Sequence, residues 1–186
     1  MPKIAEIEGT PNPCAMKFIL KEPLTWGVSR SYDNAQQAQG DALAAALFAI
    51  PHVTNVFYVD RWITITQDGR VDWQELMRKV AEPIRAAPAA AERSAQIAEA
   101  TRSEAPQVNE RDRERLERIN ALLDEHVRPY LQGDGGDLYV TGLEGNILSV
   151  HYQGACGSCP SSLSATLTGI EGLVQQVAPD LQVVPV

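Results

Sequence analysis

Two patterned stretches of sequence, separated by one without a pattern, divide this 186-residue chain. In the first stretch, β-branched and aromatic residues form two runs between residues 53 and 66, and these predict a β-hairpin. Apolar residues three and four positions apart predict an amphipathic helix at residues 72–85, and Pro83 should kink or end its last turn. An alternating run at residues 4–8, a second strand at residues 16–20 and a helix at residues 41–50 complete a first α+β domain.

The second stretch begins at Asn109, a residue type suited to cap the N-terminus of the helical stripe that follows it. The glycines of residues 133–136 predict a tight turn with positive φ. Alternating runs at residues 138–143 and 147–152 predict a hairpin around a Glu-Gly-Asn turn. A Cys-x-x-Cys loop, an amphipathic helix and a strand at residues 181–186 follow, so the predicted order is helix, hairpin, loop, helix, strand.

Between the two stretches, residues 86–108 contain nine alanines and few large aliphatic side chains. Pro88 and Pro106 lie near the two ends of this segment, which has no apolar face to bury. The pattern therefore predicts two small mixed α/β domains of the α+β class, at residues 1–85 and 109–186, joined by a flexible alanine-rich linker.

Charge narrows the classes of partner. The chain has a net charge of −8, and residues 109–186 hold 5 basic and 11 acidic side chains (5 − 11 = −6), with no Lys or Arg after Arg128. This predicts a domain that binds neither nucleic acid nor an anionic membrane surface. No apolar run approaches the roughly 18–20 residues of a membrane helix. Because the first residues include acidic side chains, unlike a signal or transit peptide, we expect a cytoplasmic location.

Chemistry is concentrated at two of the three cysteines, Cys156 and Cys159. An odd, small number of cysteines argues against a disulfide framework. With two residues between them, both sulfurs can converge on one metal centre, and Gly154 and Gly157 let the backbone wrap a bulky ligand. Pro160 suits the first helical turn and places Cys159 at the N-cap, where the helix dipole favours thiolate over thiol. Thiolates select soft metals such as zinc, copper(I) and iron–sulfur clusters.

The spacing alone leaves three interpretations at roughly equal weight: a redox dithiol, a zinc site and a cluster site. Zinc sites and common clusters want four protein ligands, and a second copy of the chain could supply the missing pair across a two-fold axis. A thioredoxin-like dithiol belongs in a βαβ unit, whereas a hairpin precedes this motif and no parallel crossover is expected. His126 and His151 are interpreted as surface or core histidines, and Cys14 as a small buried or loop thiol.

The order of short motifs in residues 116–186 resembles the NifU C-terminal (Nfu-type) domain. These motifs are Arg128-Pro129, Asp134-Gly135-Gly136-Asp137, Gly154-Ala155-Cys156 and Cys159-Pro160-Ser161-Ser162. The first domain resembles the Nfu N-terminal domain. Its matching motifs are Thr10-Pro11-Asn12-Pro13, Lys17-Phe18, Leu47-Phe48-Ala49-Ile50, Val56-Phe57, Ile63-Thr64-Ile65-Thr66 and Asp72-Trp73.

The resemblance implies an iron–sulfur cluster scaffold or carrier and not an enzyme. Cys156 and Cys159 match the family's ligand pair, which implies a [4Fe–4S] cluster, with [2Fe–2S] as the alternative type, shared across a homodimer. The partners implied are upstream cluster assembly proteins and the apo iron–sulfur proteins that receive the cluster by ligand exchange near solvent. The first domain, without a ligand set of its own, is expected to recognise these partners. A thioredoxin-like dithiol oxidoreductase and a zinc-stabilised interaction module remain the alternatives.

Overall fold

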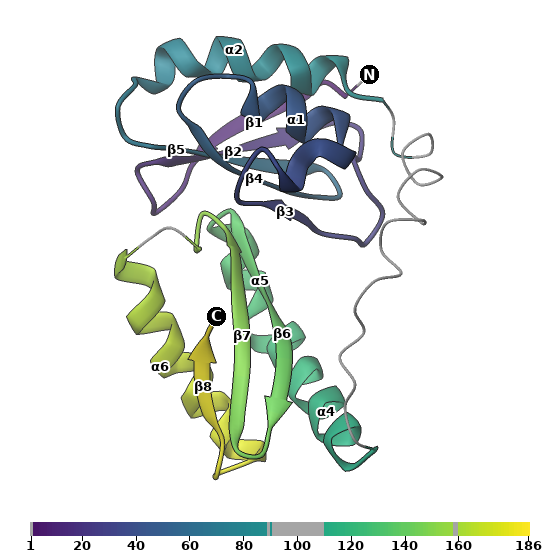
Figure 1. The fold of residues 1–186 in the computed structure, drawn as a ribbon, viewed down its shortest axis with the longest axis vertical. Helices are drawn as coiled ribbons and strands as arrows, with labels where there is room; N and C mark the ends of the chain where they lie inside the picture. Colours follow the sequence, from purple (N-terminus) through teal and green to yellow (C-terminus); the bar gives the residue numbers. More distant parts are fainter. Residues whose placement is uncertain (1, 89, 91–109, 158–159) are drawn as a thin grey trace. The chain divides into compact units, whose positions relative to one another are not determined.

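The structure, a computed structural model, describes residues 2–88, 90, 110–157 and 160–186. The chain divides into two compact units, Met1–Ser103 (unit 1) and Glu104–Val186 (unit 2), drawn in Figure 1. This division falls within the predicted linker, most of which lies outside the described residues. Each unit is therefore considered by itself.

Unit 1 is built on a five-stranded antiparallel sheet with the strand order β1-β2-β5-β4-β3. The strands are β1 (Ile4–Gly9), β2 (Ala15–Leu20), β3 (Arg30–Tyr32), β4 (Val53–Val59) and β5 (Trp62–Gln67). The predicted hairpin is confirmed, because β4 pairs with β5 across a turn in which Asp60 adopts a positive φ of 47°. The short edge strand β3 was not predicted.

Two helices, α1 (Ala42–Phe48) and α2 (Trp73–Ala86), cover one face of this sheet, and a short 3-10 helix, η1 (Gln37–Gly40), precedes α1 (Figure 1). Buried residues of both helices and of β2, β4 and β5, among them Phe18, Tyr58 and Val80, form the core of unit 1, and Ile4 of β1 packs against it partly buried. Pro83 lies inside the last turn of α2, and the helix ends three residues later, at Ala86. A proline at this position removes only one backbone hydrogen bond, so the turn can still form. Ala87 is buried in the same core, so the start of the predicted linker packs with unit 1.

Unit 2 combines a three-stranded sheet with helices on one face. The elements are α4 (Glu110–His126), α5 (Arg128–Gly133), β6 (Gly136–Glu144), β7 (Ile147–Gly154), α6 (Pro160–Val177) and β8 (Gln182–Pro185). The predicted hairpin is the antiparallel pair β6–β7. Buried side chains of α4 and α6, among them Ile119 and Val174, pack on the inner face of the sheet. In the described part of the chain, no helix has the length and apolar character needed to cross a bilayer.

Unit 2 corrects two expectations. Of the glycines in residues 133–136, Gly133 ends helix α5 and Gly136 begins β6, so only Gly135 has a positive φ, of 81°. Helix α5 exists because a proline at its start pre-sets helical φ directly after α4 ends.

The second correction concerns the topology of the unit 2 sheet. Strand β8 pairs with β7 in parallel, so β7–α6–β8 is the parallel crossover that the sequence was not expected to form.

Candidate functional site

Cys156 lies in a tight turn that follows β7 and is joined to the loop before β6. The backbone N–H of Ala155 donates a hydrogen bond of 3.2 Å to the carbonyl oxygen of Gly135. The N–H of Gly157 donates one of 3.2 Å to the carbonyl oxygen of Gly154, which closes the turn. Two motifs that are about twenty residues apart in the sequence are thus held side by side by the antiparallel pairing of β6 and β7.

The closest approach in this region is between Gly136 and Cys156. A β-carbon placed on Gly136 would lie 2.5 Å from Cys156 Sγ, 3.0 Å from its Cβ and 2.7 Å from the carbonyl oxygen of Gln153. All three distances are at or below the shortest that a real β-carbon shows. Glycine at position 136 therefore leaves the space that the sulfur of Cys156 occupies. The sequence analysis assigned this glycine only to a turn, because a contact across a hairpin has no local signal.

Cys156 is also buried more deeply than the sequence indicated. Its side chain is 3% exposed and belongs to the core cluster of unit 2, whereas the transfer mechanism anticipated a ligand near solvent. The cause is the tight turn, which folds the sulfur inward over β6. Gly157, in contrast, is exposed, so only the rim of the turn faces water.

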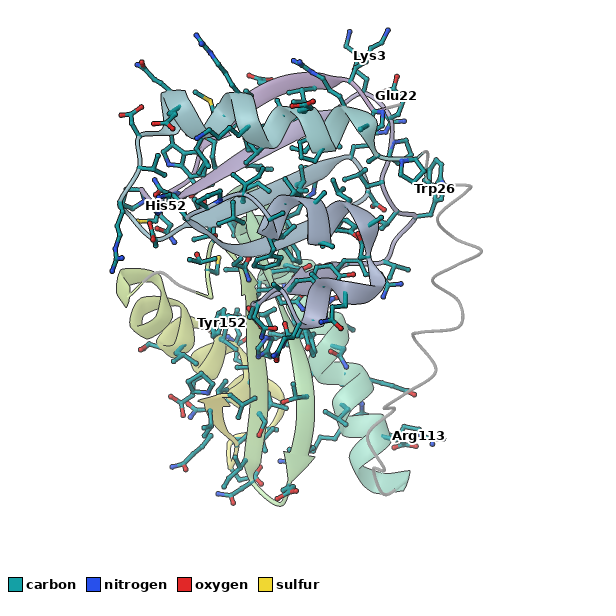
Figure 2. All side chains as sticks on the ribbon, turned by 45° about the horizontal axis from the view of Figure 1, so that its top comes forward. Lys3, Glu22, Trp26, His52, Arg113 and Tyr152 are labelled. Atoms are coloured by element: carbon teal, nitrogen blue, oxygen red, sulfur yellow. The ribbon has the colours of Figure 1, made fainter. Side chains whose placement is uncertain are left out.

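Tyr152 lies on the inner side of the same turn and was missed by the sequence analysis. Figure 2 marks it on strand β7, and it packs in the core cluster that includes Cys156 and residues of α6. Its side chain is 6% exposed, and its hydroxyl has no hydrogen-bond partner among the described residues. Burial raises the pKa of this hydroxyl to about 12, and the charge on Cys156 contributes to the rise. The neutral hydroxyl is therefore the form present at physiological pH.

Asp137, the residue after Gly136, supports the start of β6 from within. It is 5% exposed; its Oδ1 accepts a hydrogen bond of 2.8 Å from the N–H of Leu138, and its Oδ2 accepts one of 3.2 Å from Gln132 Nε2. Burial raises the pKa of the carboxyl, while these hydrogen bonds and the charge of Arg128 oppose the rise. The side chain holds α5 against β6, in agreement with a structural role for this turn.

Cys159 lies outside the described residues, as does Ser158, so the second predicted ligand has no position to compare. Helix α6 begins at Pro160, as predicted. The described surroundings of Cys156 comprise an opposing position without a side chain, at Gly136, and the buried hydroxyl of Tyr152 in the same core cluster. Among the described residues, no three His, Cys, Asp or Glu side chains form a group that could hold a metal ion.

The other candidate ligands are placed elsewhere. Cys14 lies directly before β2 in unit 1 and is partly exposed. His151 lies on the outer face of the unit 2 sheet, where its Nδ1 is 2.8 Å from the carbonyl oxygen of Val186. Its ring centroid is 5.4 Å from that of Tyr139, with the two rings tilted by 50°. His126 Nε2 lies 3.9 Å from a carboxylate oxygen of the neighbouring Glu125. Both histidines thus have packing or surface roles, as the sequence analysis interpreted them.

Comparison with known families covers both units. Residues 4–90 match the model described as "Scaffold protein Nfu/NifU N terminal". Residues 119–185 match the model described as "NifU-like domain". These matches include all of the described strands and the site turn; the first runs into the start of the predicted linker, to residue 90, and the second begins after the linker ends.

Whole-chain relatives agree with these domains. The chain is 30% identical to the Arabidopsis thaliana protein named "NifU-like protein 5, mitochondrial" over 95% of its own length and 65% of the relative's. It is 32% identical to the Homo sapiens protein named "NFU1 iron-sulfur cluster scaffold homolog, mitochondrial", over 95% and 69% of the two lengths. The chain thus spans about two thirds of these relatives, and its own cytoplasmic location stays a prediction. The chain belongs to the Nfu family of iron–sulfur cluster scaffold proteins.

Proposed function

We propose that this protein binds an iron–sulfur cluster as cargo through Cys156 and Cys159 and hands it to apo-proteins. The observation that supports this most directly is the contact between Cys156 and Gly136, where the sulfur fills the space that any side chain would take. Helix α6 begins at Pro160, directly after Cys159 in the sequence, and the free N–H groups of a helix N-terminus favour a thiolate at that position. Thiolates are the ligands that iron–sulfur clusters require.

The number of cysteines in unit 2 favours a cluster shared by two copies of the chain. A [4Fe–4S] cluster takes four cysteine ligands, and unit 2 contains two cysteines. Two copies related by a two-fold axis would present the same pair to one another and complete the set. A [2Fe–2S] cluster needs the same four ligands and would be accommodated by the same arrangement.

Transfer would proceed by ligand exchange and not by catalysis. Each thiolate of the acceptor replaces one cysteine of the carrier at one iron, so no substrate is converted. Because Cys156 is buried, the turn formed by residues 154–157 has to open before its bond to iron is reached. The acceptors would be apo iron–sulfur proteins, the donors upstream cluster assembly proteins, and unit 1 the part that recognises them.

The second candidate function is a dithiol oxidoreductase, and the topology of unit 2 favours it more than the sequence did. The Cys-x-x-Cys motif follows β7 and leads into α6, and β8 returns parallel to β7. This βαβ setting at a helix N-terminus is the one in which redox dithiols occur. A zinc-stabilised module has no comparable observation in its favour.

Analysis of one anaerobic preparation separates these functions. Reconstituted with iron and sulfide, the proposed carrier should sediment as a dimer with about two iron atoms per chain, since two chains share one [4Fe–4S] cluster. Zinc would give metal without sulfide. A colourless monomer that reduces insulin disulfides catalytically would replace the proposed function with the oxidoreductase.

Variants of the cysteines provide the matched control. Cys156→Ser and Cys159→Ser should each abolish iron and sulfide retention, whereas Cys14→Ser, in unit 1, should retain as much as the wild type. If Cys14→Ser loses as much iron as Cys156→Ser, the assignment of the ligand pair is wrong.

A further inference from the structure

The hydroxyl of Tyr152 is an unusual group to leave without a partner. The side chain is 6% exposed, lies in the core of unit 2 beside β7 and α6, and has no hydrogen-bond partner among the described residues (Figure 2). A buried polar group without a partner destabilises the fold, and phenylalanine would fill the same space without this cost. An unpaired donor of this kind points to a ligand that supplies the missing acceptor.

The same turn brings this hydroxyl and the predicted ligand into one environment. Tyr152 and Cys156 belong to one buried cluster, in the core of unit 2. The turn also brings the two backbones close together: a β-carbon on Gly157 would lie 3.0 Å from the carbonyl oxygen of Tyr152, so the residue after Cys156 is folded back onto the tyrosine backbone. Among the described residues, no atom accepts a hydrogen bond from this hydroxyl.

We propose that Tyr152 donates a hydrogen bond to sulfur of the bound cluster site, either the thiolate of Cys156 or a cluster sulfide. This inference rests on the proposed function and adds a positioning residue to it. The sulfur of a thiolate bound to iron carries negative charge and accepts hydrogen bonds, and such bonds to sulfur stabilise a cluster and raise its reduction potential. The neutral tyrosine hydroxyl supplies the donor. It lowers the stability of the apo protein, where it has no partner, and stabilises the cluster once the cluster is bound.

The substitution Tyr152→Phe tests this because its effects should have opposite signs with and without the cluster. In the apo protein, the urea midpoint of unit 2 should rise, since an unpaired buried hydroxyl is removed. In the loaded protein, loss of the cluster to a chelator should become about tenfold faster, the equivalent of one hydrogen bond to a charged group. The reduction potential of the bound cluster should shift to a more negative value.

Tyr130→Phe is the matched control. Tyr130 is 75% exposed, so its hydroxyl meets water in both states and its removal should change neither the midpoint nor the rate. A role in packing alone would move the apo and loaded proteins in the same direction.

Each outcome decides the inference. A Tyr152→Phe protein that is less stable in the apo form would show that the hydroxyl already has a partner there, and would overturn it. Cluster loss at the wild-type rate would overturn this inference alone, while leaving the cluster-binding function intact. A wild-type chain that takes up no iron or sulfide would overturn both.

Discussion

Cys156 Sγ sits where the side chain of residue 136 would otherwise be, because a β-carbon on Gly136 would lie 2.5 Å from it. The sulfur and the glycine lie at the open end of the β6–β7 hairpin, where Gly136 is paired with Gly154. The Asp-Gly-Gly-Asp motif and the Cys-x-x-Cys motif therefore act as one structural feature. A substitution in the Asp-Gly-Gly-Asp motif should therefore alter the position of Cys156.

Gly136→Ala should destabilise unit 2 and impair cluster retention. The added methyl group meets the backbone oxygen of Gln153 as well as the sulfur, so the hairpin end has to shift, at a cost of about 1–3 kcal/mol. Urea unfolding followed by far-UV circular dichroism measures the loss. All three tryptophans lie in unit 1, so tryptophan fluorescence should show an unchanged transition for that unit.

Gly142→Ala is the control in the same strand. A β-carbon there would have no neighbour within 4 Å, so the substitution should be neutral or stabilise unit 2 by about 0.5–1 kcal/mol through lower backbone entropy of the unfolded chain. Equal destabilisation by both substitutions would show that the contact with Cys156 does not matter.

Elements specified by their own local sequence could be predicted, whereas elements that depend on pairing with distant residues could not. The β4–β5 and β6–β7 hairpins and helix α2 follow from local alternation, helical periodicity and turn residues, and they were predicted close to their observed bounds. Strand β3 has three residues and exists because it pairs with β4, which no local pattern specifies.

The same distinction applies to the candidate site. The chemistry of Cys156 could be inferred from spacing and from the helix that follows. Its burial could not, because it depends on Gly136 across the hairpin. The parallel pairing of β8 with β7 was also missed, since an apolar strand has the same local pattern in a parallel or an antiparallel neighbour position.

Thiol labelling should report the burial of Cys156 directly. In a Cys159→Ser background, Cys14 and Cys156 are the remaining cysteines. Cys14 is partly exposed and Cys156 buried, so iodoacetamide should modify Cys156 in the apo protein on the order of tenfold more slowly, because its reaction requires local opening. Mass spectrometry of the two peptides gives both rates. In denaturant the rates should converge, and similar rates in the native protein would contradict the buried position.

Substitution of Asp41 should strongly destabilise unit 1 and leave cluster retention in unit 2 unchanged. Its Oδ1 accepts hydrogen bonds of 3.0 and 2.9 Å from the N–H groups of Leu43 and Ala44 at the start of α1, and its Oδ2 accepts one from the buried hydroxyl of Tyr58. Asp41→Ala removes the cap and strands that hydroxyl, which should cost about 2–4 kcal/mol. Tryptophan fluorescence in urea measures the loss.

The graded control for Asp41→Ala is Tyr32→Phe. The hydroxyl of Tyr32 makes a longer bond of 3.3 Å to the same Asp41 oxygen from a half-buried position, so its removal should cost less. Retention of iron and sulfide should match the wild type in both variants. A loss of cargo in Asp41→Ala would show that unit 2 depends on the folding of unit 1.

Asp137→Asn should change how the stability of unit 2 depends on pH. Burial raises the pKa of Asp137 above its ordinary value of 3.8. Between that ordinary value, which applies to the unfolded chain, and the raised value of the folded protein, the folded state binds more protons than the unfolded state. The contribution of this carboxyl to stability therefore falls as pH rises through that window and is constant above it. Arg128 opposes the rise and Asp124 adds to it, so both charges act on the same group. Asparagine does not titrate, and its Oδ1 can still accept the hydrogen bond from the N–H of Leu138.

The difference in unfolding free energy between Asp137→Asn and the wild type, measured in urea at a series of pH values, isolates this carboxyl from the others. The variant should gain stability relative to the wild type as pH rises through the window, and the gain should persist at neutral pH. Asp134→Asn, which changes an exposed carboxylate of the same motif, is the matched control. A relative loss of stability with rising pH would mean that Asp137 is stabilised as an anion, and that its hydrogen bonds from Gln132 and Leu138 outweigh its burial.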